Sequence, residues 1–353
     1  MALNNLFIIL FLIIFNIFFY KYFLLIINSY NPKLFIDDQF KKPQAFHQSP
    51  VSVLGGSCIF FSFTIMFFYF FLIKNIVFFE FFSICTLFFL LGFIDDLKIN
   101  IKPLHRLTLM IVFLLALVKY NSFYLANTGI DFLNAWILNS EIFSLVFICL
   151  CFLFVINGAN LIDGYNGLLG IHSIIIITNL FLINFLNENN DLAILLFFMI
   201  IVILLFLKFN FPRANVFLGD SGSYFLGAFI AISVIKTSID NPEISPFYFC
   251  ILLFYLFFEV FFSFFRKIIK EKISPIYPDK KHLHMILYKM LLKKNYGKFK
   301  SNYSVSIIIN SIYFIFTVPA VFMIDNDMFC KYYSIILFII YVFSYKKIYD
   351  KIK

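Results

Sequence analysis

The stretch DLAILLFFMIIVILLFLK, residues 191–208, decides the fold class of this chain. Only Asp191 and Lys208, its first and last residues, carry charge. An α-helix needs roughly 20 apolar residues, and about 17 at a minimum, to cross the hydrocarbon core of a bilayer. The stretch therefore predicts a membrane-spanning helix.

The composition extends this prediction to the whole chain. Of 353 residues, 62% are hydrophobic and 13% are charged, and the mean hydropathy is +0.95. Soluble domains carry roughly 45–50% apolar and about 25% charged residues. The excess apolar surface requires lipid as its solvent. The six cysteines lie in or beside apolar runs and predict no disulfide framework.

Apolar runs of spanning length recur along the chain, with short polar segments between them. We therefore expect an all-α, polytopic membrane protein with about 10–11 transmembrane helices, forming one domain over residues 1–353. The predicted spans are 5–27, 53–73, 76–94, 106–120, 141–157, 168–187, 191–208, 222–237, 247–265, 304–324 and 329–345.

The distribution of Lys and Arg predicts the orientation. One set of loops, with the flanking helix ends, holds 24 of the 28 basic residues. By the positive-inside rule these loops are cytoplasmic and the N-terminus is outside. The most basic loop, 266–303, favours anionic lipid at the membrane surface, and we expect no nucleic-acid partner. The loops of this set are 28–52, 95–105, 158–167, 209–221, 266–303 and the tail from 346.

Five polar stretches interrupt the apolar sequence, and all of them lie on the predicted cytoplasmic side. Asp95, Asp96, Asp163 and Asp220 each begin or end a predicted helix there, where an ionisable group is costly unless it is paired or functional. The stretches are HQSPVSVLGG (47–56), GFIDDLKINIKPLHRL (92–107), NGANLIDGYNGLLG (157–170), FPRANVFLGDSGSYFLG (211–227) and SPIYPDKKHLHM (274–285).

Adjacent carboxylates at Asp95 and Asp96 repel each other, and the negative end of a helix dipole adds to the repulsion. The pair therefore implies a cation, which is either a metal ion or a nearby basic side chain such as Arg106. In FLGDSGS (217–223), Asp220 can hold Mg²⁺, and the helix N-terminus can bind phosphate. The alternative for Asp220 is a simple helix N-cap.

Asparagines and histidines supply further donors on the same side. Asn160, Asp163 and Asn166 follow a period of three, which fits either a helix face that binds a base or sugar, or a polar turn between helices. His282 and His284 fit either a pyrophosphate or a surface loop without a role. Taken together, these groups indicate a phosphoryl-transfer site, where Mg²⁺ and positioned cations neutralise charge.

These motifs resemble the polyprenyl-phosphate N-acetylhexosamine-1-phosphate transferases, the glycosyltransferase family 4. The resemblance rests on GFIDDLK, NLIDGYNGLLG, FLGDSGSYFLG and HLHM, and it runs from His47 to Met285. It implies a bacterial inner-membrane enzyme with a cytoplasmic active site. The implied partners are a UDP-sugar, polyprenyl (undecaprenyl) phosphate and the lipid bilayer, and a homodimer is left open.

The resemblance also implies residue roles. Asp95 and Asp96 lie in the catalytic centre, Asp220 ligates Mg²⁺, with Mn²⁺ as an alternative ion, and Arg106 matches a basic position of the active site.

The nucleotide pocket is implied at Asn160, Asp163 and Asn166, with Phe217 stacking on uracil. Asn166 stands where the family usually has Asp, which alters one nucleotide contact.

His282 and His284 match the pyrophosphate-facing His motif, and His47 matches an early His before the Gly-Gly turn. Met285 and Ser52 depart from the His and Pro usual in the family. The HLHM form favours the UDP-GlcNAc:undecaprenyl-phosphate GlcNAc-1-phosphate transferase branch, which initiates cell-surface glycans such as O-antigen.

A lipid-linked-sugar flippase is the alternative from another class. It needs charged residues along a path through the membrane, and Glu80 and Glu259 are the acidic residues inside predicted spans, apart from those at the first position of a span.

Overall fold

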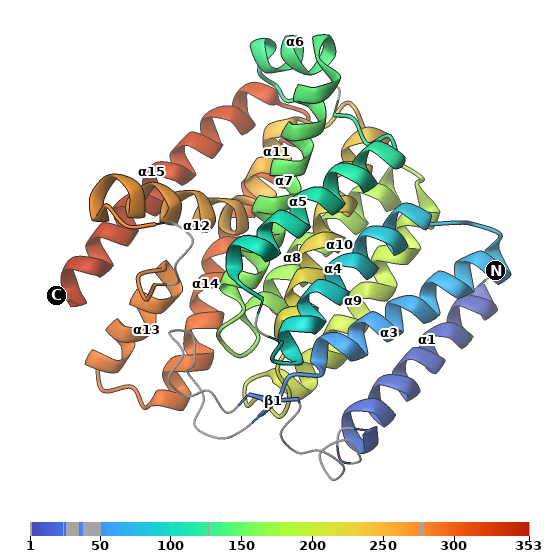
Figure 1. Ribbon diagram of the computed structural model, residues 1–353, viewed down its shortest axis with the longest axis horizontal. Coiled ribbons are helices and arrows are strands. Elements are labelled where there is room, and N and C mark those ends of the chain that lie inside the picture. The colour runs from blue at the N-terminus through green and yellow to red at the C-terminus, as the bar shows by residue number, and fades with distance from the viewer. Residues whose placement is uncertain are drawn as a thin grey trace.

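The computed structural model of the chain is a bundle of helices (Figure 1). It describes residues 2–23, 25, 35–37, 51–99, 101–125, 127–274 and 279–352. The prediction of an all-α protein is confirmed. The α-helices are α1 (Ala2–Phe18), α3 (Gly55–Tyr69), α4 (Phe79–Asp96), α5 (Pro103–Tyr120), α6 (Asp131–Asn139), α7 (Glu141–Ile162), α8 (Leu168–Leu186), α9 (Asn190–Asn210), α10 (Gly219–Asp240), α11 (Pro246–Leu252), α12 (Phe254–Phe265), α13 (Leu283–Lys293), α14 (Lys298–Val321) and α15 (Asp327–Ile352). Short π-helical turns extend α1, α3 and α12, namely η1 (Phe19–Phe23), η2 (Phe70–Lys74) and η3 (Arg266–Glu271).

Most of the predicted spans correspond to helices that can cross a membrane. Among the described residues, 9 helices are long and apolar enough, or 10 if the bent pair α11–α12 counts as one span. The protein is therefore a multi-pass membrane protein. The remaining predicted span, 76–94, corresponds to α4, whose 18 residues include the three carboxylates Glu80, Asp95 and Asp96.

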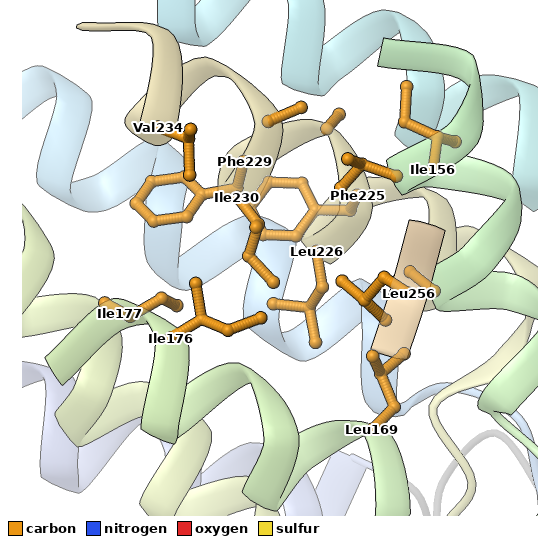
Figure 2. Close-up of a cluster of buried hydrophobic side chains, with 14 of the residues drawn as sticks. Ile156, Leu169, Ile176, Ile177, Phe225, Leu226, Phe229, Ile230, Val234 and Leu256 are labelled. Atoms are coloured by element: carbon orange, nitrogen blue, oxygen red, sulfur yellow. The ribbon is translucent and has the colours of Figure 1, made fainter. Parts of the chain in front are cut away.

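Helix α10 lies at the centre of the bundle, packed against α3, α4, α7 and α8. Figure 2 shows its apolar side chains, including Phe225 and Phe229, against Ile156 of α7 and Ile176 of α8. The sequence predicted only a short span there, 222–237, whereas the helix has 22 residues. The prediction was too short because the small and polar residues of its first turns dilute the apolar pattern.

Two glycines let α10 approach its neighbours closely. A Cβ atom on Gly92 of α4 would lie 2.3 Å from the carbonyl oxygen of Asp220, and one on Gly56 of α3 would lie 2.3 Å from the backbone nitrogen of Gly222. Side chains at these positions would push the helices apart. Both glycines therefore set where the first turn of α10 lies.

A short two-stranded sheet lies at the end of the bundle toward which α1 runs from the N-terminus (Figure 1). Strands β1 (Ile36–Asp37) and β2 (Val51–Ser52) are antiparallel, and Ser52 also forms a parallel bridge with Val216. The backbone N–H of Phe217 donates to the oxygen of Ser52 at 2.7 Å, and that of Gly55 donates to the oxygen of Phe217 at 2.9 Å. These bonds join the starts of α3 and α10.

The predicted span 247–265 is interrupted. Helices α11 and α12, the latter continued by η3, are bent by 77° at Leu253, so α12 runs across the direction of the bundle (Figure 1). The chain then returns through α13, which packs against both α14 and α15. This bend brings Glu259, in the middle of α12, to the HLHM segment.

Candidate active site

Asp96, the last residue of α4, caps the start of α10. Its Oδ1 accepts a hydrogen bond from the backbone N–H of Asp220 at 2.8 Å, and its Oδ2 accepts one from that of Ser221 at 3.0 Å. A helix N-terminus leaves such N–H groups without partners inside the helix, and a carboxylate there is favourable. The positive φ of Gly219, +79°, turns the chain into this arrangement. The repulsion expected at Asp96 is thus offset by another helix.

Asp220 lies in the first turn of α10 and is held from α7. Its Oδ1 accepts a hydrogen bond from Nδ2 of Asn160 at 2.8 Å, and the same nitrogen lies 2.9 Å from Oγ of Ser223. Asn160 therefore joins the residue predicted to ligate the metal with the predicted nucleotide pocket. Asp163 follows directly after α7, at its C-cap.

Asp95 pairs with Arg106, which the sequence singled out as a possible partner. The Nη1 atom of Arg106 donates to Oδ2 of Asp95. The guanidinium carbon lies 5.7 Å from the ring centroid of Tyr224, four residues after Asp220 on α10. We call Asp95, Asp96, Asp163 and Asp220 the carboxylate cluster.

The charges of the carboxylate cluster act on one another. The pKa of Asp163 is raised well above its ordinary value, mainly by desolvation and to a smaller extent by the negative charges of Asp220 and Asp96. A bound cation would reverse the repulsion that contributes to this shift. A cation near Asp163 would therefore favour its charged form.

The donor set fits Mg²⁺. Within the part of the chain that the structure describes, no three His, Cys, Asp or Glu side chains are grouped to hold a metal ion by themselves. Mg²⁺ commonly uses one or two carboxylates and takes its other ligands from water and substrate phosphates. Asp220 and Asp163 are carboxylates of this kind, whereas Asp96 already accepts two backbone hydrogen bonds.

His282 and His284 lie side by side near the start of α13, with ring centroids 5.6 Å apart and planes at 4°. Nδ1 of His282 lies 3.1 Å from Oε2 of the buried Glu259 on α12, and its Nε2 lies 3.4 Å from Oδ1 of Asp279. Glu259 also accepts hydrogen bonds from the backbone N–H of Leu283 at 3.0 Å and from the hydroxyl of Tyr341 at 2.7 Å. We call His282, His284, Glu259 and Asp279 the histidine cluster.

His284 is fully buried. Its Nδ1 lies 3.2 Å from the hydroxyl of Tyr255, and its ring packs edge-on against Tyr165, with centroids 5.7 Å apart. Burial lowers the pKa of His284 to about 3. At neutral pH the side chain is therefore uncharged. Its contact with Tyr165 links the start of α13 to the turn after α7.

The other predicted residues of the nucleotide pocket have these positions. The backbone N–H of Asn166 donates to Oδ1 of Asn302 at 2.9 Å, and its Nδ2 donates to the oxygen of Pro212 at 2.9 Å. Phe217 is half-buried in the segment bonded to β2. His47 lies outside the described residues.

Sequence reasoning missed three residues of this region. Tyr224 looks like an ordinary apolar core position, Tyr165 lies in the polar stretch 157–170 without a chemical signal of its own, and Glu259 was weighed only as part of a transport path. A carboxylate within an otherwise apolar span was the available signal for Glu259. In the structure the carboxylate of Glu259 is bonded to groups at the start of α13 and on α15, and this pairing explains its place in the span.

Residues 78–238, somewhat less than half of the chain, match glycosyl transferase family 4. The match contains α4, α5, α7 and most of α10, and thus the whole carboxylate cluster.

Individual relatives come from two branches. The phospho-N-acetylmuramoyl-pentapeptide-transferase of Dictyoglomus turgidum is 35% identical over 166 residues, covering 44% of this chain and 52% of the relative. The undecaprenyl-phosphate alpha-N-acetylglucosaminyl 1-phosphate transferase of Thermotoga maritima is 34% identical over 157 residues, covering 44% and 45%. The chain spans about half the length of the curated relatives it matches. Identities of 35% and 34% do not place the chain nearer to one branch than to the other.

Proposed function

We propose that the protein transfers a sugar-1-phosphate, in particular an N-acetylhexosamine-1-phosphate, from a UDP-sugar to polyprenyl phosphate, with release of UMP. The observation that carries this proposal is the meeting of the carboxylate cluster with Arg106 at the ends of α4, α5, α7 and α10. Anionic diphosphates need cations and positioned donors, and such a cluster can hold both.

The reaction exchanges one phosphoanhydride for another. An oxygen of polyprenyl phosphate attacks the β-phosphorus of the UDP-sugar, and the bond from that phosphorus to the oxygen bridging the two phosphates breaks, so that UMP leaves. Bond types are conserved, and we expect the reaction to be reversible by added UMP. The acceptor phosphate, with a second pKa near 6, is largely dianionic at neutral pH and barely needs a base.

Asp220 and Asp163 are the residues that we assign to Mg²⁺. When bound, the ion supplies positive charge to the diphosphate. Asn160 orients Asp220 through the 2.8 Å hydrogen bond. The hydrogen bonds of Asp96 to α10 and the ion pair of Asp95 with Arg106 favour positioning roles over proton transfer for both residues.

We assign the nucleotide to the turn after α7 and the neighbouring segment, with Asn166 and Phe217 as contacts. His282 faces the pyrophosphate, whereas the uncharged His284 supports the turn through Tyr165. We place the end of the bundle that carries the carboxylate cluster in the cytoplasm of a bacterium, because the loops of that set hold most of the Lys and Arg residues of the sequence. The product would initiate a cell-surface glycan, and the HLHM form favours a GlcNAc-type donor.

The test is UMP release by membranes that contain the protein, supplied with polyprenyl phosphate, Mg²⁺ and a panel of UDP-N-acetyl sugars. We expect release with one donor, none with EDTA, and a fall of at least about 10³-fold in Asp220→Asn, because removal of one key electrostatic group costs about 10²–10³ in rate and this one also holds the ion. Full activity of Asp220→Asn would refute the metal assignment. Movement of a lipid-linked sugar across vesicles without UMP release would favour a flippase.

A further inference from the structure

Tyr224 lies beside the carboxylate cluster but has no role in the reaction as described above. It is fully buried on α10, one helical turn after Asp220. The guanidinium carbon of Arg106 lies 5.7 Å from its ring centroid, and Asp220, Asp95 and Asp96 all act on it electrostatically. Its ring therefore lies beside Arg106 and within electrostatic reach of the carboxylates assigned to phosphate chemistry.

The hydroxyl of Tyr224 has no hydrogen-bond partner within the described residues. Other buried phenols do have partners: Tyr341 donates to Glu259 at 2.7 Å, and Tyr248 lies 3.3 Å from Oδ1 of Asn179. A buried polar group without a partner is destabilising, and such groups are rare in folded proteins. The hydroxyl of Tyr224 is thus a donor that the described part of the fold does not use.

The depth of Tyr224 indicates which phosphate it could meet. Four residues along an α-helix are about 6 Å, so Tyr224 lies about 6 Å further into the bundle than Asp220. A UDP-sugar is water-soluble and approaches from the helix ends, whereas a polyprenyl phosphate stays anchored in the bilayer. A donor on the bilayer side of the carboxylates, beside the cationic Arg106, suits the phosphate of the lipid.

We propose that Tyr224 is a binding residue for the acceptor, donating its hydroxyl hydrogen to a phosphate oxygen of the polyprenyl phosphate beside Arg106. This inference rests on the proposed function for the identity of the acceptor. Arg106 supplies the charge, and Tyr224 supplies a directional hydrogen bond. Hydrogen bonds to charged groups are stronger than neutral ones.

The experiment compares wild type with Tyr224→Phe, which removes the hydroxyl and retains the ring under Arg106. Purified full-length protein is titrated with a short-chain polyprenyl monophosphate and with the alcohol of the same chain. We expect about 10-fold weaker binding of the phosphate in Tyr224→Phe, and unchanged binding of the alcohol. Tyr248→Phe, which removes a buried hydroxyl on α11, is the matched control and should bind both lipids like wild type.

Thermal unfolding separates this role from a structural one. Because the hydroxyl has no partner among the residues that the structure describes, Tyr224→Phe should unfold at the wild-type temperature or above it. Equal phosphate affinity in Tyr224→Phe and wild type, an equal loss for the alcohol, no phosphate binding by wild type, or a lowered unfolding temperature would each overturn the proposal. If wild type binds the phosphate but releases no UMP with any donor, the proposed function fails, and the affinity ratio still decides the role of Tyr224.

Discussion

The carboxylate cluster and the histidine cluster differ in how far the protein compensates their charges. In the histidine cluster, each buried ionisable group meets a partner: Glu259 accepts from His282, Leu283 and Tyr341, and Asp279 lies between His282 and Arg266. Burial alone would raise the pKa of Asp279. The neighbouring His282, the backbone N–H of Lys281 and Arg266 lower it by more, so the pKa lies below its ordinary value.

In the carboxylate cluster the balance is reversed. Arg106 pairs with Asp95, while the charges of Asp96 and Asp220 raise the pKa of Asp163. Natural proteins keep such uncompensated groups mainly at functional sites, where a ligand completes them. The difference teaches that protein groups compensate the charges of the histidine cluster and so fix the position of α13 and His282, whereas the charges of the carboxylate cluster are left for ions and phosphates to compensate.

Breaking the histidine cluster at Glu259 should have the largest effect on stability. Removing one partner of a buried charged pair costs about 3–5 kcal/mol, and we expect Glu259→Ala to lower the free energy of unfolding by about that amount. Glu259→Gln keeps an acceptor for Leu283 and Tyr341 and loses only the charge. Its UMP release should fall about 10-fold to 100-fold, because misplacing a group by about 1 Å costs on the order of 10² in rate.

The readouts for Glu259 are thermal unfolding and the separation of kcat from KM. A positioning residue should lower kcat while leaving the KM for polyprenyl phosphate unchanged. Glu141→Ala is the control, because Glu141 lies 3.7 Å from Lys119 with both side chains largely exposed, at 62% and 68%, and the loss of an exposed pair costs about 0–1 kcal/mol. Wild-type kcat in Glu259→Gln would contradict the positioning role.

Asp163 should behave in the opposite way to Glu259. Because its folded-state pKa is raised above the ordinary 3.8, the protonated form is favoured by folding, so this stability is present at low pH and is lost as pH rises through the raised pKa. Asp163→Asn should therefore be more stable than wild type at neutral pH in EDTA, by about 0.5–2 kcal/mol. Mg²⁺ should stabilise wild type more than the variant, because a ligand that binds the folded state stabilises it.

Unfolding temperatures measured from about pH 4 to about pH 8, with EDTA and with Mg²⁺, test this prediction. In EDTA, the unfolding temperature of Asp163→Asn should exceed that of wild type by more as pH rises. This difference should become smaller when Mg²⁺ is added. A variant that is less stable than wild type at neutral pH, or that gains as much from Mg²⁺, would show that Asp163 is not part of an uncompensated cation site.

The two clusters also differ in how far the sequence predicts them. The carboxylates follow from local rules, since each stands where an apolar run ends, and the orientation rule places those ends together. The structure brings Asp96, Asp163 and Asp220 together as that reasoning requires. The capping of α10 by Asp96 could not be predicted, because it joins residues 124 positions apart.

The histidine cluster depends on features without a local signal. The chain bends by 77° at Leu253 with neither Gly nor Pro in CILLFYLF (250–257), the residues that usually mark a sharp bend. Tyr341 reaches Glu259 from α15, 82 positions away. Tyr224 falls within an apolar pattern, where an aromatic side chain is most simply explained by packing.

The smallest effect concerns two tyrosine hydroxyls that are alike in the sequence and opposite in the structure. The hydroxyl of Tyr255 has a partner, Nδ1 of His284 at 3.2 Å, whereas that of Tyr224 has none within the described residues. A typical intramolecular hydrogen bond contributes about 0.5–1.5 kcal/mol. We expect Tyr255→Phe to lose about 1 kcal/mol of unfolding free energy and to retain its affinity for polyprenyl monophosphate, measured by thermal unfolding and by lipid titration. Tyr224→Phe should retain its stability and lose affinity. If both variants lost stability and neither lost affinity, Tyr224 would be as much a structural residue as Tyr255, and this contrast between the two regions would disappear.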